Sequence, residues 1–323
     1  MEPLSRDELG SELEIIGSEL ELVEDILLSA SEGKIAFLTE SATYLTRAGG
    51  KRLRPALMLL ASMMGSGSND SVRKTAAAIE MTHLATLYHD DVIDEADLRR
   101  GVPSANEKWG NTVAILAGDY LFARASAIAA EVRGIVPAVL ADAIAEVVHG
   151  QVRELEAAYD PGRSLEHYMA TIREKTASLV EASALLGADL GGCPPDVQQT
   201  LARFGASFGY AFQVADDLLD LAGDRDELGK APGTDLRDGV YTLPVIIAVG
   251  RSKSLVRMLG SSEVDIPGAR AEIERTGAFA EARAVAEGHA REALTLLEGL
   301  PEGPARKSLE GISRLVVERV PLL

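Results

Sequence analysis

The stretch AAAIEMTHLATLYHDDVID, residues 76–94, decides the fold, because it joins a long apolar segment to a cluster of carboxylates. Asp90 and Asp94 are four residues apart, so on a helix they share one face, with Asp91 beside them. Two like charges about 4 Å apart repel each other by roughly 4 kcal/mol at an effective dielectric constant of about 20. The segment therefore predicts a helix whose end favours a bound cation.

The same pattern returns in FGASFGYAFQVADDLLD, residues 204–220, where Asp216, Asp217 and Asp220 end a second apolar segment. Carboxylates are hard oxygen ligands, which suit Mg²⁺ better than zinc. One such cluster is equally well explained as a solvated helix end. Two copies in the same context favour magnesium sites, and the missing central glycine of the loop excludes an EF-hand.

Apolar residues recur with the helical period along almost the whole chain. They do so between Leu9 and Leu27, in 53–64, 72–94, 112–132, 136–158, 165–190, 197–221 and 243–258, and in two or three helices beyond residue 266. Turn-forming residues separate these segments at 49–50, 65–69, 101–103, 160–162, 191–195 and 223–239. Sustained strand-like alternation and linkers are missing, so the sequence predicts an all-α protein with a single domain over residues 1–323.

Composition narrows the class of protein. The net charge of −18 and the pI of about 4.8 argue against nucleic-acid binding, which needs a basic face. The single cysteine, Cys193, excludes an intramolecular disulfide framework and fits a reducing cytoplasm. The N-terminal residues lack the order of a signal peptide, and no run of about 18 apolar residues predicts a membrane span.

Basic residues gather in two short segments that contain glycine. GGKRLRP occupies residues 49–55, and Arg99-Arg100-Gly101 follows the first aspartate cluster. Glycine lets the backbone approach an anion closely, while lysine and arginine supply charge and hydrogen-bond donors for phosphate. In so acidic a chain these segments predict a diphosphate site. Residues 223–230 do not form a Walker A loop, because the spacing is wrong and Ala231 stands where serine or threonine is needed.

Taken in order, these motifs resemble those of the trans-type polyprenyl diphosphate synthases, and the resemblance covers most of the chain. It rests on the segments 49–55, 83–101, 118–120, 150–151, 175–178, 212–220, 229–230, 233–236 and 242–244. The resemblance implies a helical bundle of the isoprenoid synthase type with a central active-site cavity. It also implies a homodimer and two substrates, isopentenyl diphosphate and an allylic diphosphate.

The resemblance also assigns roles to individual residues. The diphosphate of isopentenyl diphosphate is expected to bind Lys51, Arg54, His83 and Arg100. The allylic substrate is expected to bind Arg99, Lys175, Thr176, Gln213 and Lys230. The expected metal ligands are Asp90, Asp94 and Asp216, which hold Mg²⁺, with three ions per active site and support from Asp91, Asp217 and Asp220. The expected catalytic residues are therefore Asp90, Asp91, Asp94, Lys175, Asp216, Asp217 and Lys230.

Two further features follow from the resemblance. The pair Lys175-Thr176 is expected to interrupt a helix and to aim backbone carbonyls at a developing carbocation. Many members carry a second lysine before the Thr-Leu-Pro block, where this chain has Val240 and Tyr241. That contact to the allylic diphosphate is missing here, so Lys230 is expected to carry the role alone.

The length of the product follows from the residues that precede Asp90. Ala85 and Thr86 are small, whereas relatives that stop at about 15 or 20 carbons usually place bulky residues there. The growing chain is therefore expected to pass this level and to continue along Met81, with Phe122 as a deeper floor. We expect a product longer than about 20 carbons, between about 30 and 50, whose release involves contact with a membrane or partner.

Several alternatives remain at this stage. A short-chain farnesyl or geranylgeranyl diphosphate synthase differs mainly at Ala85 and Thr86. Terpene cyclases and head-to-head condensing enzymes would not need the loop from Lys51 to Arg54. A non-catalytic subunit of a heteromeric synthase typically loses an aspartate cluster or the basic loop, and this chain keeps both. A purely structural bundle leaves the clustered aspartates unexplained.

Overall fold

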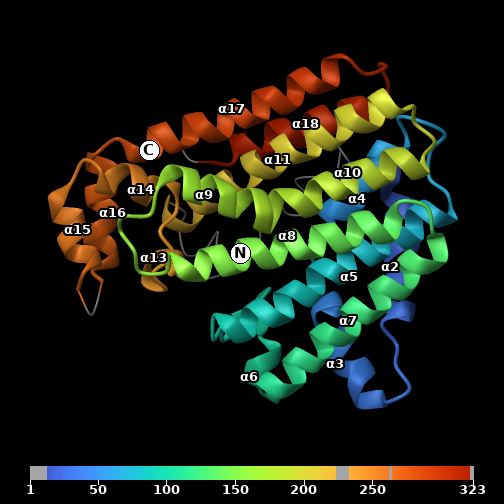
Figure 1. Cartoon of the computed structure of the whole chain (residues 1–323), viewed down its shortest axis with the longest axis horizontal. Helices are drawn as coiled ribbons and strands as arrows, with labels where there is room; N and C mark the ends of the chain where they lie inside the picture. The colour runs from blue at the N-terminus through green and yellow to red at the C-terminus, as the bar shows by residue number, and fades with distance from the viewer. Residues whose placement is uncertain (1–12, 223–232, 262–263, 321–323) are drawn as a thin grey trace.

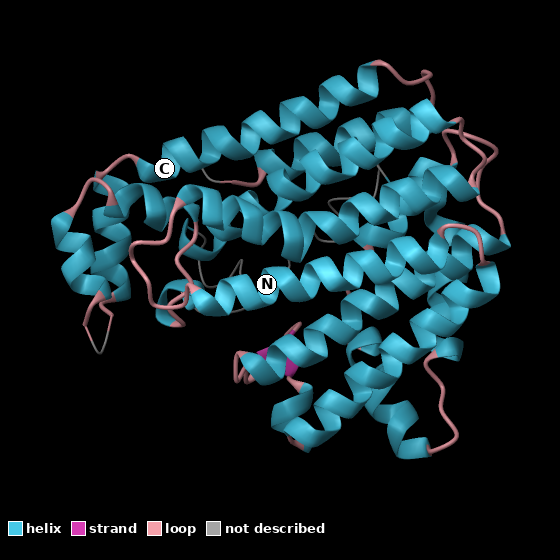
Figure 2. Cartoon of the chain, viewed as in Figure 1, coloured by secondary structure: helices cyan, strands magenta, loops and turns pink. Residues whose placement is uncertain are grey.

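Helices form nearly all of the structure, a computed structural model that describes residues 13–222, 233–261 and 264–320 (Figures 1 and 2). The first half contains η1 (Glu14–Ile16), α2 (Gly17–Ala30), α3 (Ala36–Arg47), α4 (Leu53–Ser62), α5 (Asp70–Ile93), α6 (Ala105–Trp109), α7 (Asn111–Val132) and α8 (Val136–Glu156). The second half contains α9 (Leu165–Ile172), η2 (Arg173–Ala177), α10 (Ser178–Leu190), α11 (Pro195–Ala222), α13 (Thr234–Arg237), α14 (Leu243–Val249), α15 (Lys253–Leu259), α16 (Ile266–Arg275), α17 (Ala278–Glu298) and α18 (Pro304–Glu318). The all-α prediction is confirmed.

The long helices begin where the local sequence predicts. Asn69 caps α5, because its side-chain oxygen accepts a hydrogen bond from the backbone N–H of Val72 at 3.1 Å. Pro195 opens α11, since a proline in the first turn loses no intrahelical hydrogen bond. One prediction was wrong, because residues 243–258 form two helices. The first ends at Val249 with Gly250 as its C-cap residue, and Ser252 caps the second.

The segment after α5 forms a small hairpin that the sequence reading took for a turn. Its strands are β1 (Leu98–Arg99) and β2 (Val102–Pro103), which pair antiparallel and are magenta in Figure 2. Arg100 and Gly101 join them with positive φ angles of 53° and 74°, as a type I′ turn requires. The hairpin turns the chain back, so that Arg99 and Arg100 contact the helices that precede it.

Buried alanine, leucine and other apolar side chains from almost every helix make one contiguous core. Figure 1 shows α8, α10, α11 and α17 side by side across the molecule. Glycine also allows α10 to approach α4 closely. A Cβ on Gly187 of α10 would lie 2.2 Å from the carbonyl oxygen of Met58 on α4. Small residues therefore set the spacing of the helices that carry the candidate site.

Among the described residues, one helix has the length and apolar composition that a membrane span would need. This helix is α7, and 39% of its most apolar window is buried inside the protein. It packs on α5 along its length and also contacts α3, α6 and α8. Its apolar composition is thus used, on one face, for packing within the bundle.

Candidate active site

Both aspartate clusters lie at the C-terminal ends of long helices. Asp90 and Asp91 are in the last turn of α5, and Asp94 caps it, donating its backbone N–H to the carbonyl oxygen of Asp90 at 2.8 Å. The second cluster, Asp216 to Asp220, lies in the last two turns of α11. Neither helix has a basic residue in its last turn. The carboxylates therefore add to the negative end of each helix dipole, which makes a cation there more favourable.

The first cluster is unfavourable in its charged form. Burial raises the pKa of Asp90, and burial together with the nearby charge of Asp90 raises the pKa of Asp94 to about 6. Lys175 and Arg99 oppose these shifts because they favour the ionised carboxylates. The two side chains that the sequence predicts as metal ligands thus share a site with excess negative charge.

Asp91 has a different environment from its neighbours. Its side chain is fully buried. Nε of Arg99 donates to its Oδ1 at 2.6 Å, and Nη2 of Arg99 forms an ion pair with the same oxygen, also at 2.6 Å. This pair fixes Arg99 close to Asp90 and Asp94. Asp91 therefore orients a basic side chain, which is a supporting role.

The second cluster is held by a chain of hydrogen bonds. Asp217 accepts from the hydroxyl of Tyr168 at 2.6 Å and from the amide of Gln213 at 2.8 Å, and burial raises its pKa to about 7. Thr176 donates to the amide oxygen of Gln213 at 2.7 Å. Asp220 accepts from the backbone N–H of Asp235 at 3.2 Å, which ties α11 to α13. Tyr168 and Asp235 in this network were not among the site residues predicted from the sequence.

Lys175 and Glu154 lie between the two clusters. Burial lowers the pKa of Lys175, but Glu154, which accepts a hydrogen bond from it, and Asp90 and Asp94 raise that pKa above its ordinary value. The charge of Glu154 also raises the pKa of Asp90, Asp94 and Asp217. The carboxylate of Glu154 on α8 thus interacts electrostatically with aspartates of both α5 and α11. Sequence reading missed Glu154, although it follows the Gly150-Gln151 motif by one helical turn.

The predicted interruption at Lys175-Thr176 is confirmed. Residues 173–177 form a π-helical turn, η2, between α9 and α10. Such turns widen a helix locally and occur frequently at functional sites. Gly150 permits the crossing of α8 at this point, since a Cβ there would lie 2.4 Å from the backbone nitrogen of Lys175.

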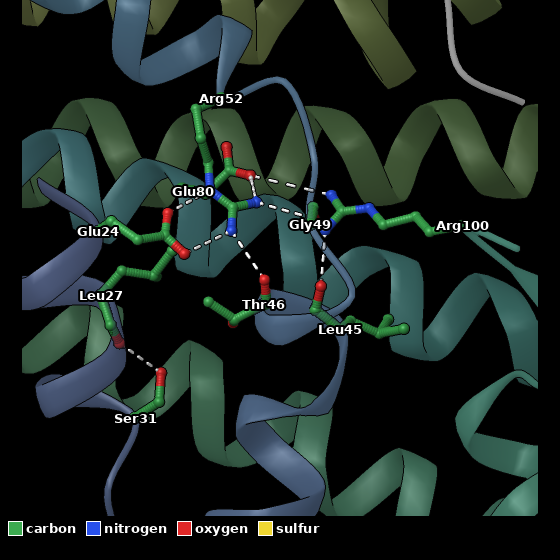
Figure 3. A network of polar contacts seen from close by, with 9 residues as sticks. All are labelled: Glu24, Leu27, Ser31, Leu45, Thr46, Gly49, Arg52, Glu80 and Arg100. Atoms are coloured by element: carbon green, nitrogen blue, oxygen red, sulfur yellow. Dashed lines mark hydrogen bonds and ion pairs between the residues drawn. The ribbon is translucent and has the colours of Figure 1, made fainter. Parts of the chain in front are cut away.

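The basic segments converge on His83. Arg100 donates to the carbonyl oxygens of Leu45, at 2.8 Å, and of Gly49 (Figure 3). Burial, followed by the charges of Arg54 and Arg100, holds the pKa of His83 well below its ordinary value, so the imidazole is neutral. Nε of Arg54 is buried without a hydrogen-bond partner. Partly uncompensated positive charge around a neutral imidazole can bind an anion.

The predicted chain-length residues differ in exposure. Ala85 and Met81 are fully buried, whereas Thr86 is half-buried and donates to the carbonyl oxygen of His83 at 2.7 Å. Phe122 on α7 packs beside His89, with 5.6 Å between the ring centroids. Of the three predicted positions on α5, Thr86 therefore keeps accessible surface.

Other predictions lie elsewhere or outside the structure. Lys230 falls outside the described residues. Lys51 is half-buried in the loop before α4.

A cavity of about 450 Å³ lies beside the end of α11 and is lined by residues of α11, α13 and α16 and their flanks, among them Arg237 and Arg270. None of the predicted site residues that the structure describes lines it. Within those residues no three histidine, cysteine or acidic side chains gather as a ready metal site.

Comparison with known proteins gives consistent results. The model of the polyprenyl synthetase family matches residues 35–267. A nonaprenyl diphosphate synthase of Mycobacterium tuberculosis is 39% identical over 87% of both chains. Heptaprenyl diphosphate synthase component 2 of Geobacillus stearothermophilus is 39% identical over 94% of this chain and 97% of its own. A short chain isoprenyl diphosphate synthase of Methanothermobacter thermautotrophicus is also 39% identical, over 87% of this chain and 90% of its own.

A solved structure has the same fold over nearly the whole chain. The crystal structure of a polyprenyl synthase from Caulobacter crescentus, complexed with calcium and isoprenyl diphosphate, superimposes with a TM-score of 0.92. It is 33% identical in sequence, and the match covers 99% of this chain and 100% of that one.

The close crossing of α8 and η2 gives a first testable prediction. Gly150→Ala places a methyl group against the backbone of Lys175, so α8 or the π-helical turn must move. We expect the free energy of unfolding, measured in urea, to fall by about 1–3 kcal/mol. Gly288→Ala on α17 is the matched control, because its Cβ meets only a side-chain atom of Arg291 at 4.0 Å. An equal loss in both variants would contradict the packing described for Gly150.

Proposed function

Because the chain belongs to the polyprenyl synthetase family, we propose that it is a trans-polyprenyl diphosphate synthase that adds isopentenyl diphosphate units to an allylic diphosphate primer. The observation that carries the proposal is the joint presence of two aspartate clusters, linked by Lys175 and Glu154, and a separate basic site around His83. A reaction between two diphosphate esters needs two such anion sites. A cyclase would need only one.

The basic site would hold the diphosphate of isopentenyl diphosphate. Arg54 in the first turn of α4 and Arg100 in the hairpin offer guanidinium groups, and Lys51 lies in the loop before α4. Neutral His83 can donate one N–H to a phosphate oxygen without adding a further positive charge. Binding there requires no metal ion.

The aspartate clusters would hold Mg²⁺ with the allylic diphosphate. Their donor set fits, since carboxylate oxygens are preferred magnesium ligands and the ion usually takes the rest of its shell from water and phosphate. Asp90 and Asp94 on α5 and Asp216 on α11 are the proposed ligands, and we expect three ions per active site. When bound, magnesium supplies positive charge to the departing pyrophosphate. The related Caulobacter crescentus protein was crystallised with calcium and isoprenyl diphosphate, which supports a divalent metal ion in this family.

The chain's own residues would prepare and protect the reaction. Lys175 and Arg99 bring positive charge to the same side as Asp90 and Asp94, where pyrophosphate leaves. The double bond of isopentenyl diphosphate then attacks the allylic carbon, and a proton is lost to form the new trans double bond. The released pyrophosphate is the proposed proton acceptor. The widened turn at η2 leaves carbonyl groups that can stabilise the cationic carbon.

The metal assignment can be tested by substitution. Asp90→Ala or Asp216→Ala should lower kcat by at least about a hundredfold, because each removes a ligand that acts in the transition state. Elongation of an allylic diphosphate by radiolabelled isopentenyl diphosphate measures this, with and without EDTA. Asp142→Ala removes an exposed carboxylate of α8 and should change kcat by less than about twofold. Full activity of the Asp90 variant would refute the assignment.

The proposed product is longer than about 20 carbons. Its supports are the small residues Ala85 and Thr86 and the names of the nonaprenyl and heptaprenyl relatives. A shorter product is the alternative, because the short chain isoprenyl diphosphate synthase of Methanothermobacter thermautotrophicus is also 39% identical. Thr86 is the proposed level at which the growing chain passes α5, because it keeps accessible surface.

Product length should respond to the size of residue 86. Thr86→Phe narrows the passage, so we expect products of about 20 carbons or fewer, detected by mass spectrometry of the extracted diphosphates. Thr86→Val has nearly the same volume and should leave the distribution of products unchanged. A product as long as that of the wild type from the Thr86→Phe variant would place the passage elsewhere.

We further propose that the chain forms a homodimer in the cytoplasm through α7 and α8. Both helices expose large apolar side chains, which are Ile115, Leu116, Val148, Val152 and Leu155, each between 42% and 57% exposed. Contiguous apolar surface of this kind marks protein interfaces. A partner of a different sequence is the alternative, since one relative is named as a component of its synthase.

The oligomeric state distinguishes these possibilities. The wild type should elute as a dimer in size-exclusion chromatography with light scattering, and Val148→Glu should shift it to monomer, because a buried charge is costly. Val256→Glu on α15 is the matched control, since Val256 is also partly exposed and α15 packs mainly on α14 and α16. A monomeric wild type that gains activity only with a second protein would favour the heteromeric alternative.

A further inference from the structure

Arg52 is held entirely by the protein. Its Nε and Nη2 donate to the two carboxylate oxygens of Glu24 at 2.7 and 2.8 Å, and its Nη1 donates to Oε1 of Glu80 at 3.1 Å (Figure 3). Nη2 and Nη1 also donate to the carbonyl oxygens of Thr46 and Gly49 at 3.0 and 3.3 Å. These five contacts use the donors of the whole guanidinium group. Although Arg52 lies in the basic loop, it has no donor left for a substrate.

The backbone at Arg52 has an unfavourable conformation. Its φ of 53° lies in the left-handed region, after Gly49 and Gly50 with φ of 95° and 138°. A side chain in that region costs on the order of 1 kcal/mol or more, so surrounding contacts must impose it. Arg52 is also the N-cap residue of α4. Its conformation therefore sets the direction in which α4 begins and the placement of Lys51 and Arg54 on either side.

Glu80 connects the clamp to the anion site. Its carboxylate is almost fully buried, lies 4.0 Å from Nη2 of Arg100, and raises the pKa of both Arg54 and Arg100 against the effect of burial. The two negative charges of Glu24 and Glu80 thus offset only part of the positive charge of Arg52, Arg54 and Arg100. The remaining positive charge and the unpartnered Nε of Arg54 are what an anion would meet.

We propose that Glu24 and Glu80 are positioning residues, which clamp Arg52 from two helices and so hold Arg54 and Arg100 in the geometry that recognises the diphosphate of isopentenyl diphosphate. This inference rests on the proposed function for the identity of the diphosphate. Glu24 lies on α2, which precedes the region from residue 35 that the family model matches. The clamp makes this N-terminal helix part of substrate recognition without any contact between α2 and the substrate.

The same helix offers a matched control for a merely structural role. Glu19 also lies on α2 and also pairs with an arginine of the bundle, because Nε and Nη2 of Arg73 on α5 donate to it at 2.7 and 3.1 Å. The two hydrogen bonds from Arg73 to Glu19 connect α5 to α2, just as the two from Arg52 to Glu24 connect the start of α4 to α2. Arg73, however, lies near the first turn of α5, far along the helix from His83.

The experiment compares Glu24→Gln, Glu80→Gln and Glu19→Gln in the full chain. Isothermal titration with isopentenyl diphosphate gives Kd, steady-state assays give KM for both substrates, and thermal unfolding gives Tm. We expect Glu24→Gln and Glu80→Gln to raise the Kd of isopentenyl diphosphate about tenfold, as expected for a lost charge-assisted hydrogen bond, with the KM of the allylic substrate within about twofold. Glu19→Gln should lower Tm similarly but leave Kd unchanged.

Each outcome decides a specific point. Wild-type affinity in folded Glu24→Gln protein, or an equal loss in Glu19→Gln, would overturn the positioning role. If Glu80→Gln does not fold, Glu24→Gln decides by the same criterion, because the Glu24 side chain is 32% exposed and tolerates the change. A wild type that binds no isopentenyl diphosphate and elongates no primer would instead refute the proposed function.

Discussion

The structure depends on carboxylates gathered at the negative ends of two long helices. Six aspartates end α5 and α11, where burial and mutual repulsion raise the pKa of Asp94 to about 6 and that of Asp217 to about 7. Such an arrangement weakens the fold unless positive charge offsets it. Lys175 and Arg99 supply part of that charge, and metal ions with a diphosphate would supply the rest. Binding of metal ions and a diphosphate at the proposed site would therefore stabilise the fold.

The surrounding helices serve to keep this site and the basic site apart and rigid. Gly150 lets α8 cross the π-helical turn, which brings Glu154 against Lys175 between the two aspartate clusters. On the other side of α5, Glu80 and Glu24 hold Arg52 and, through it, the start of α4. In each proposed diphosphate site, glutamate side chains therefore contact the basic residues: Glu154 pairs with Lys175, and Glu24 and Glu80 pair with Arg52. That arrangement positions the cations without neutralising all of them.

The sequence was sufficient where the signal is local. The aspartate spacing and the long amphipathic helices were predicted, because a helix places residues four apart on one face. The break at Lys175-Thr176 was predicted from the family resemblance and not from the local sequence. Helix α3 was missed because several of its buried residues are polar, among them Ser41, Thr43 and Thr46, so its core-facing side is not marked by apolar residues alone. Glu24, Glu80 and Glu154 were missed for another reason. A glutamate on a helix resembles any surface charge until tertiary packing shows what it faces.

Mass spectrometry of the products is the most direct test of the whole account. Purified protein would receive farnesyl or geranylgeranyl diphosphate, isopentenyl diphosphate and Mg²⁺. The account predicts a ladder of prenyl diphosphates in steps of five carbons that extends beyond about 20 carbons and disappears with EDTA. Failure to elongate either primer in the presence of Mg²⁺ would contradict the claim that the two aspartate clusters and the basic site form a complete chain-elongating centre.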